Sequence, residues 1–133
     1  MSIETVNQWL EPLGRLIGQS LQLNEEGALG IELNSGALCT IEFDSGSEHL
    51  HLHSVVASVA PSDTAKTLLR AMKENLYGIG TSGYNLGFDD ARGELVLGYQ
   101  RPISMLNEEI FLLELESFAA TCDSLRQTFQ SKN

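Results

Sequence analysis

Asn75–Asp89 has the sequence NLYGIGTSGYNLGFD and takes the chain from a helix into a strand. Apolar residues recur at helical spacing before it, and Gly78 is a typical helix stop. Glycines 78, 80 and 83 admit positive φ and close backbone approach, which favours a tight helix-to-strand connection. A phosphate-binding loop is the competing interpretation. It would need the glycines to open a helix and a lysine to follow, and this stretch meets neither requirement.

Strand patterns lie on both sides of this connection. Downstream, Tyr84–Phe88 and Glu94–Gln100 predict a hairpin across the turn-rich residues 89–93, and Pro102 ends the second strand. Upstream, clusters of Asn, Asp, Ser and Gly separate three segments that predict an antiparallel meander. These segments are Ala28–Leu33, Ala37–Phe43 and Glu48–Val56.

Three stretches have the apolar period of a helix. The first carries Ile3, Val6, Leu10, Leu13 and Ile17, with Ser2 available as its N-cap. Pro12 lies inside this stretch and predicts a kink or break near Gln8–Glu11, because it lacks a backbone donor and crowds the preceding turn. The second, before the glycine-rich connection, carries Ala65, Leu68, Leu69, Met72 and Leu76. The last begins after Asn107 and carries Phe111, Leu115, Phe118, Cys122, Leu125 and Phe129.

The order α-β-β-β-α-β-β-α predicts an α+β fold in which helices flank an antiparallel sheet. The 133 residues suffice for a single domain, 1–133, with its own core. Eight basic and 18 acidic residues give a net charge of −10, which disfavours nucleic acid and anionic membranes as partners. The start of the chain lacks the pattern of a signal peptide, so we expect a cytoplasmic protein. Cys39 and Cys122 are expected to be reduced and buried.

One group of residues has a pattern compatible with metal binding, because alternate residues of a strand share a face: His49, His51 and His53. The outer two lie roughly 13 Å apart along a strand, too far to share one ion. A half-exposed polar strand face is the simpler interpretation. No catalytic residue and no cofactor are predicted, since the carboxylate pairs fall in turns and at a helix start.

Residues 75–89, together with Leu95-Val96-Leu97 and Arg101-Pro102-Ile103, closely resemble the central signature of the Tir chaperone family, the class I chaperones of type III secretion. The resemblance extends to residues 13–15, 106–109 and 115–118, and to the order of elements. It implies a homodimer formed mainly through the second helix and the following strand. The residues expected at that interface are Leu69, Met72, Lys73, Leu76, Tyr84, Leu86 and Phe88.

The resemblance also implies apolar patches, on the first helix and the sheet, that hold a partly unfolded effector segment. The residues expected there are Trp9, Leu13, Leu16, Leu29, Ile31 and Leu33. Two alternatives stay open from the residues alone. Trp9 is either a core anchor or an exposed contact, and the three residues of the first strand are functional only if their sheet face is uncovered.

The expected function is therefore a chaperone that binds the N-terminal region of a secreted effector and keeps it soluble, partly unfolded and ready for export. Its expected partners are the effector polypeptide, a second copy of itself and the secretion ATPase, which would drive release. Two other functions remain open: a small metal-dependent enzyme that uses His49, His51 and His53, and a dimeric interaction module of the same fold without a role in secretion.

Overall fold

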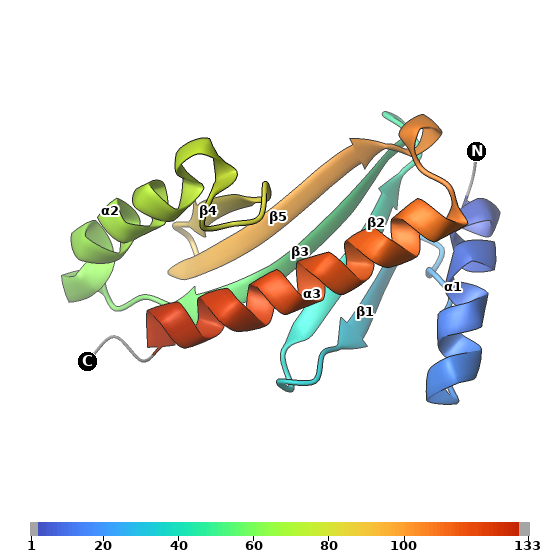
Figure 1. Ribbon diagram of the computed structural model, residues 1–133, viewed down its shortest axis with the longest axis horizontal. Helices are drawn as coiled ribbons and strands as arrows, with labels where there is room; N and C mark the ends of the chain where they lie inside the picture. The colour runs from blue at the N-terminus through green and yellow to red at the C-terminus, as the bar shows by residue number, and fades with distance from the viewer. Residues whose placement is uncertain (1–2, 131–133) are drawn as a thin grey trace.

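The computed structural model describes residues 3–130 and confirms the predicted α+β order (Figure 1). The helices of this range are α1 (Ile3–Ile17), α2 (Thr64–Asn75) and α3 (Glu108–Gln130). The strands are β1 (Ala28–Glu32), β2 (Leu38–Asp44), β3 (His49–Ser58), β4 (Asn85–Asp89) and β5 (Glu94–Pro102). Short 3-10 turns lie between them: η1 (Pro61–Asp63), η2 (Leu76–Gly78) and η3 (Ile103–Met105).

The five strands form one antiparallel sheet in the order β1-β2-β3-β5-β4. The predicted meander and hairpin are joined through β5, which pairs with β3 from Glu94 to Pro102. One face of the sheet carries buried residues such as Ile41, Leu52 and Leu97, and α3 crosses this face lengthwise (Figure 1). β1 and β4 are therefore the two edge strands.

The helix α3 follows the prediction closely. The side-chain Oδ1 of Asn107 accepts a hydrogen bond from the Ile110 N–H at 2.8 Å, which caps the helix start. All six apolar residues of the predicted stripe are buried, and each of the five Phe and Leu side chains among them contributes roughly 1.5–3 kcal/mol by leaving water. Near the other end, the Arg126 guanidinium donates to the Val55 carbonyl at 2.8 and 3.1 Å, where β3 bulges. Asn107 therefore fixes where the helix begins, and Arg126 ties its last turns to β3.

The helix α1 differs from its prediction at Pro12. It is one α-helix from Ile3 to Ile17 with Pro12 inside it, so the expected break near Gln8–Glu11 is wrong. The helix buries Val6, Trp9 and Leu10 in the core, and this packing offsets the hydrogen bond that proline removes. The expected N-cap, Ser2, lies outside the described residues.

The glycine-rich connection makes the tight turn that its sequence predicts. Gly78 has φ 70° and Gly83 has φ 88°, and a Cβ on Gly78 would lie 3.0 Å from the Gly83 Cα. Thr81 is fully buried between them, and its hydroxyl donates to the Tyr84 carbonyl at 2.6 Å. Tyr77 also takes a positive φ of 56°, which turns its side chain out of the helical course of α2.

Candidate functional site

The two edges of the sheet differ in how many of their outward backbone groups lack a hydrogen-bond partner within residues 3–130. At β4, the Asn75 side chain satisfies both outward backbone groups of Leu86, because its Nδ2 donates to the Leu86 carbonyl at 3.0 Å and its Oδ1 accepts from the Leu86 N–H at 2.8 Å. Asn75, at the end of α2, therefore covers part of that edge. No hydrogen bond from elsewhere in residues 3–130 reaches the outward groups of Phe88, so one N–H and one C=O of β4 stay open.

At β1, the pairing with β2 determines which backbone groups point outward. The Phe43 N–H donates to the Gly27 carbonyl at 2.8 Å just before the strand. Bonded and non-bonded pairs alternate along an antiparallel ladder. Counting from Gly27, the even-numbered residues Ala28, Gly30 and Glu32 direct their N–H and C=O groups away from β2.

Of these three residues, only Ala28 has its outward groups satisfied. Its N–H donates to Asn24 Oδ1 at 3.0 Å, and its carbonyl accepts from the Asn24 N–H at 2.9 Å. No hydrogen bond from elsewhere in residues 3–130 reaches the outward groups of Gly30 and Glu32. Two N–H and two C=O groups therefore form an open edge with the spacing that an added strand needs.

Apolar side chains flank this open edge. Leu29, Ile31 and Leu33 lie half-buried against the core, with part of each side chain in solvent. On α1, Leu13 is also half-buried, and Leu16 is 82% exposed. Figure 1 places α1 at the end of the molecule where β1 lies. We call the open backbone of Gly30 and Glu32, with Leu29, Ile31 and Leu33, the β1 edge site.

Trp9 does not belong to this exposed set. It is 9% exposed, and its ring centroid lies 5.7 Å from that of Phe111 on α3. The sequence left open whether Trp9 is a core anchor or an exposed contact, and in the structure it is a core anchor. Its position slightly off the apolar stripe of α1 brings the ring against α3 and not toward solvent.

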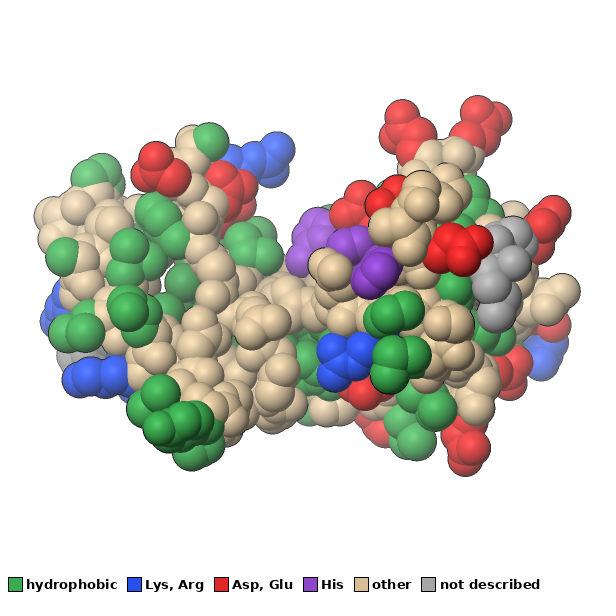
Figure 2. All heavy atoms as spheres, turned by 90° about the horizontal axis from the view of Figure 1, so that it is seen from above, with side chains coloured by type: hydrophobic (Ala, Val, Ile, Leu, Met, Phe, Trp, Pro, Cys, Tyr) green, Lys and Arg blue, Asp and Glu red, His purple; other side chains and the backbone are tan. Residues whose placement is uncertain are grey.

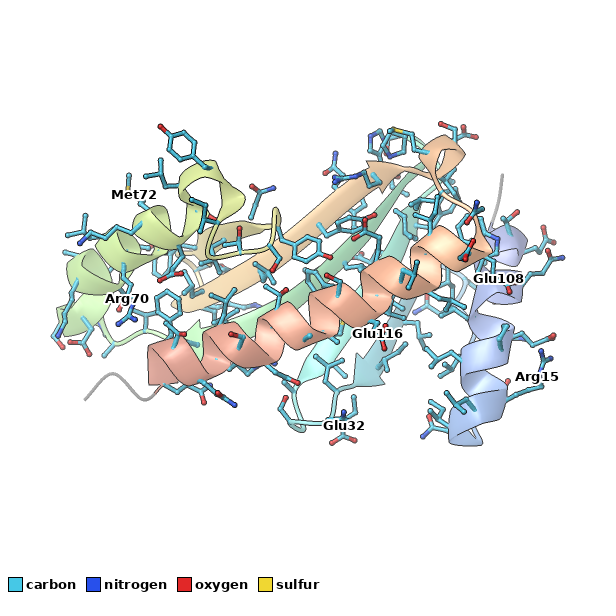
Figure 3. The ribbon with its side chains drawn as sticks, viewed as in Figure 1. Arg15, Glu32, Arg70, Met72, Glu108 and Glu116 are labelled. Carbon is cyan, nitrogen blue, oxygen red and sulfur yellow. The ribbon has the colours of Figure 1, made fainter. Side chains whose placement is uncertain are left out.

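The second candidate surface lies on α2 and η2. The buried residues of α2 are Thr67 and Ala71, so its larger apolar side chains point outward. Leu69, Met72 and Leu76 are 57%, 69% and 56% exposed. Figure 2 shows hydrophobic side chains gathered over this end of the molecule, and Figure 3 shows Met72 pointing away from the sheet. Lys73 lies exposed beside them.

The remaining residues of the predicted interface are less accessible. Tyr84 and Leu86 are buried in the subunit, and Phe88 is half-buried. The Tyr84 hydroxyl donates to Glu114 Oε1 at 2.9 Å, and its ring meets Phe118 edge-on at 5.3 Å between centroids. Burial raises the pKa of Tyr84 to about 12. Tyr84 and Leu86 are therefore part of the subunit core and not of its exposed surface.

Sequence reasoning missed two residues of this surface. Tyr77 and Ile79 are 88% and 80% exposed, the highest values among the large apolar side chains at this end. The signal was present, because both are apolar residues within a glycine-rich connection where no helix or strand period accounts for them. We call Leu69, Met72, Leu76, Tyr77 and Ile79 the α2 surface.

The histidines of β3 share one half-exposed face, as predicted, but they have separate surroundings. His53 Nε2 lies 2.7 Å from Glu42 Oε1, while the rings of His49 and His51 are 6.4 Å apart between centroids. Among residues 3–130, no three His, Cys, Asp or Glu side chains are placed to hold a metal ion. Figure 2 shows the three imidazoles as one exposed polar group.

None of the helices in the described range is both long and apolar enough to cross a membrane.

In comparisons with solved structures, the chain superposes on a chain of the ExsC–ExsE complex with TM-score 0.73 at 20% identity, covering 94% of this chain and 93% of that one. With a chain of the HopA1–SchA chaperone–effector complex the TM-score is 0.70 at 17% identity, covering 96% of this chain and 98% of that one. With a chain of the ExoT–SpcS complex from Pseudomonas aeruginosa the TM-score is 0.64 at 18% identity, covering 90% of this chain and 96% of that one.

At these identities the structural likeness shows the fold. No curated protein matches the sequence. The model of the Tir chaperone protein (CesT) family matches residues 8–126, from the middle of α1 almost to the end of α3. The chain belongs to the Tir chaperone protein (CesT) family.

Proposed function

We propose that this protein is a class I type III secretion chaperone that binds the N-terminal region of a secreted effector and keeps it soluble, partly unfolded and competent for export. The observation that carries the proposal is the β1 edge site, an open strand edge beside half-buried apolar side chains in a member of the Tir chaperone family. One solved structure of the same fold is that of a chaperone–effector complex.

The β1 edge site suits an extended ligand. An effector segment can add as a sixth strand and bond to the N–H and C=O groups of Gly30 and Glu32. Its alternate side chains then cover Leu29, Ile31 and Leu33, and each Å² of apolar surface removed from water contributes roughly 25 cal/mol. An unfolded segment can offer both a free backbone and alternate apolar side chains to this edge, so the site favours a segment held in an unfolded state.

The α2 surface suits a second copy of the chain. A monomer in water gains by covering five exposed apolar side chains that lie together, and a two-fold dimer presents the same patch from both subunits. Pairing through α2 leaves β1 free, because β1 and β4 are at opposite edges of the sheet. A dimer of this kind carries two β1 edge sites.

Binding of this kind needs neither catalysis nor nucleotide. The protein works at equilibrium in the cytoplasm, where the effector is made, and its acidic surface keeps a complex with exposed apolar segments soluble. Release at the secretion machinery then falls to the secretion ATPase.

The test is capture of partners from the native cell, followed by limited proteolysis of the complex. We expect a protected stretch near the N-terminus of a secreted protein, with the rest of that region cut readily. The variant Gly30→Pro removes one outward N–H and should weaken capture, whereas Gly30→Ala adds a Cβ and keeps the N–H. Recovery of only folded, protease-resistant partners, or equal capture by both variants, would contradict the proposal.

A further inference from the structure

The β1 edge site has two residues whose side chains face away from α3, on the histidine face of the sheet. Gly30 and Glu32 both lie there, since alternate residues of a strand share a face. Gly30 has no side chain of its own, and Leu38 of β2 leans over it. A Cβ on Gly30 would meet Leu38 Cδ1 at 3.2 Å. Leu38 is 59% exposed, so its outer surface is free.

Glu32 is exposed and has no ion-pair partner among residues 3–130. A cationic contact to this hairpin comes from Arg126 on the other face. Its Nη1 lies 3.5 Å from the Ser35 hydroxyl and is already paired with Asp123 at 3.1 Å. Figure 3 shows the Glu32 side chain at the β1–β2 hairpin, pointing away from the body of the molecule.

We propose that these side chains select the strand that the β1 edge site accepts: a basic residue opposite Glu32 and a large apolar or aromatic residue opposite Gly30. This inference rests on the proposed function and adds the sequence chemistry of the bound segment. In the antiparallel arrangement, which is slightly more stable per residue, residues directly opposite share a face. The residues opposite Gly30 and Glu32 also exchange both backbone hydrogen bonds with them, because the N–H and C=O groups of Gly30 and Glu32 point outward.

Each position has its own physical reason. Opposite charges directly across a strand pair attract, and like charges repel. A chain of net charge −10 also disfavours an acidic segment at long range. Opposite Gly30, a large apolar side chain covers the bare glycine backbone and reaches the exposed Leu38, as aromatic residues do when they pair with edge glycines.

The order along the bound segment follows from the antiparallel direction. The residue opposite Glu32 comes first, then an apolar residue opposite Ile31, then the large residue opposite Gly30, and then an apolar residue opposite Leu29. The accepted strand therefore has the pattern basic, apolar, large apolar, apolar. The first and third of these side chains face outward, and the second and fourth cover the core side.

The experiment is selection of displayed random ten-residue segments by the full-length chain. Wild-type protein should enrich the four-residue pattern above. Glu32→Lys should reverse the charge preference at the first position to acidic, and Leu38→Ser should abolish the size preference at the third position alone. Asp90→Lys makes a comparable charge change in the exposed β4–β5 turn and should leave both preferences as in wild type.

A peptide from the wild-type selection then provides a quantitative check. Replacing its basic residue by Glu should weaken binding about threefold to tenfold at low salt, with the difference shrinking in high salt. If wild-type protein and the Glu32→Lys variant enrich segments with the same charge at the first position, this inference is overturned and the proposed function stands. Enrichment of no extended segment at all overturns both.

Discussion

At the scale of single residues, Trp9 separates packing from binding. Helical periodicity placed it beside the apolar stripe of α1, which is compatible with either role, because the sequence gives a face but not what covers that face. The partner that covers it is Phe111, about a hundred residues away in α3. A contact between such distant parts of the chain leaves no trace in local spacing.

Truncation of this side chain tests its role. We expect Trp9→Ala to lower the free energy of unfolding by about 3–5 kcal/mol, because it leaves a cavity against Phe111. Leu16→Ala, on the same helix but 82% exposed, should change it by less than about 0.5 kcal/mol. Denaturant unfolding measures both values. A Trp9→Ala protein as stable as wild type, but unable to hold a partner, would instead make Trp9 a contact.

The two thiols give the stability a dependence on alkaline pH. Burial is the main cause that raises the pKa of Cys39 from 9.0 to about 12 and that of Cys122 to about 11. Below pH 9 both thiols are protonated in the folded and unfolded states. Above it, the unfolded chain loses its thiol protons first, so stability falls as pH rises from 9 toward 12.

We therefore expect the free energy of unfolding to drop by on the order of 1–2 kcal/mol per thiol between about pH 8 and about pH 10.5. Urea titrations in reducing buffer measure this slope. Cys39→Ala should make the slope shallower, whatever it does to the stability at neutral pH. A slope unchanged by Cys39→Ala would show that other groups cause the alkaline loss.

At the scale of elements, the connection from α2 to β4 depends on Asn75. Its side chain makes two hydrogen bonds to the Leu86 backbone and so satisfies the outward groups of β4 at that residue. The sequence indicated the helix and the strand on either side, but not this cap, because an asparagine at a helix end is equally typical of a simple turn. The cap becomes visible only when β4 is placed beside α2.

We expect Asn75→Ala to cost about 1–3 kcal/mol, because it leaves an N–H and a C=O of Leu86 without partners in a partly buried place. It should also expose a strand edge and promote aggregation on heating. Asn85→Ala, an exposed asparagine of β4, is the matched control and should be close to neutral. Equal stabilities of the two variants in thermal unfolding would rule out the cap.

Most of the elements were predictable because each has its own local period. The stripe of α3 and the alternation of β3 appear where the sequence indicated them, whereas α2 ends at Asn75 and a 3-10 turn takes the chain on to the predicted stop, Gly78. The pairing of β5 with β3 was not predicted, since two open strand edges of similar composition can each accept the hairpin. The break expected at Pro12 was wrong for a related reason: tertiary packing of α1 outweighs the local penalty.

At the scale of the whole molecule, the distribution of exposed apolar side chains separates two surfaces. The family resemblance pointed to both regions, yet it could not say which residues face solvent. Tyr84 and Leu86 have the apolar character of interface residues and are buried within the subunit. Tyr77 and Ile79 escape any periodic pattern and are the most exposed residues of the α2 surface.

The dimer proposal predicts that a charge introduced on the α2 surface lowers the mass of the protein in solution, whereas the same change at an equally exposed leucine elsewhere does not. Leu69→Asp should convert a dimer to a monomer, because it places a charge within the α2 surface. Leu113→Asp makes the same change on α3, where the leucine is 59% exposed against 57% for Leu69, and should remain dimeric. Sedimentation equilibrium measures the masses. Identical masses for both variants would place the interface elsewhere.

The most direct measurement of whether β1 accepts an extended polypeptide is hydrogen exchange of the backbone amides, followed by NMR. It compares the full chain alone with the full chain bound to its captured effector segment. The amides of Gly30 and Glu32 should exchange much more slowly in the complex, while Ala28, already bonded to Asn24, changes little. Unchanged exchange at Gly30 and Glu32 in a stable complex would contradict strand addition at this edge.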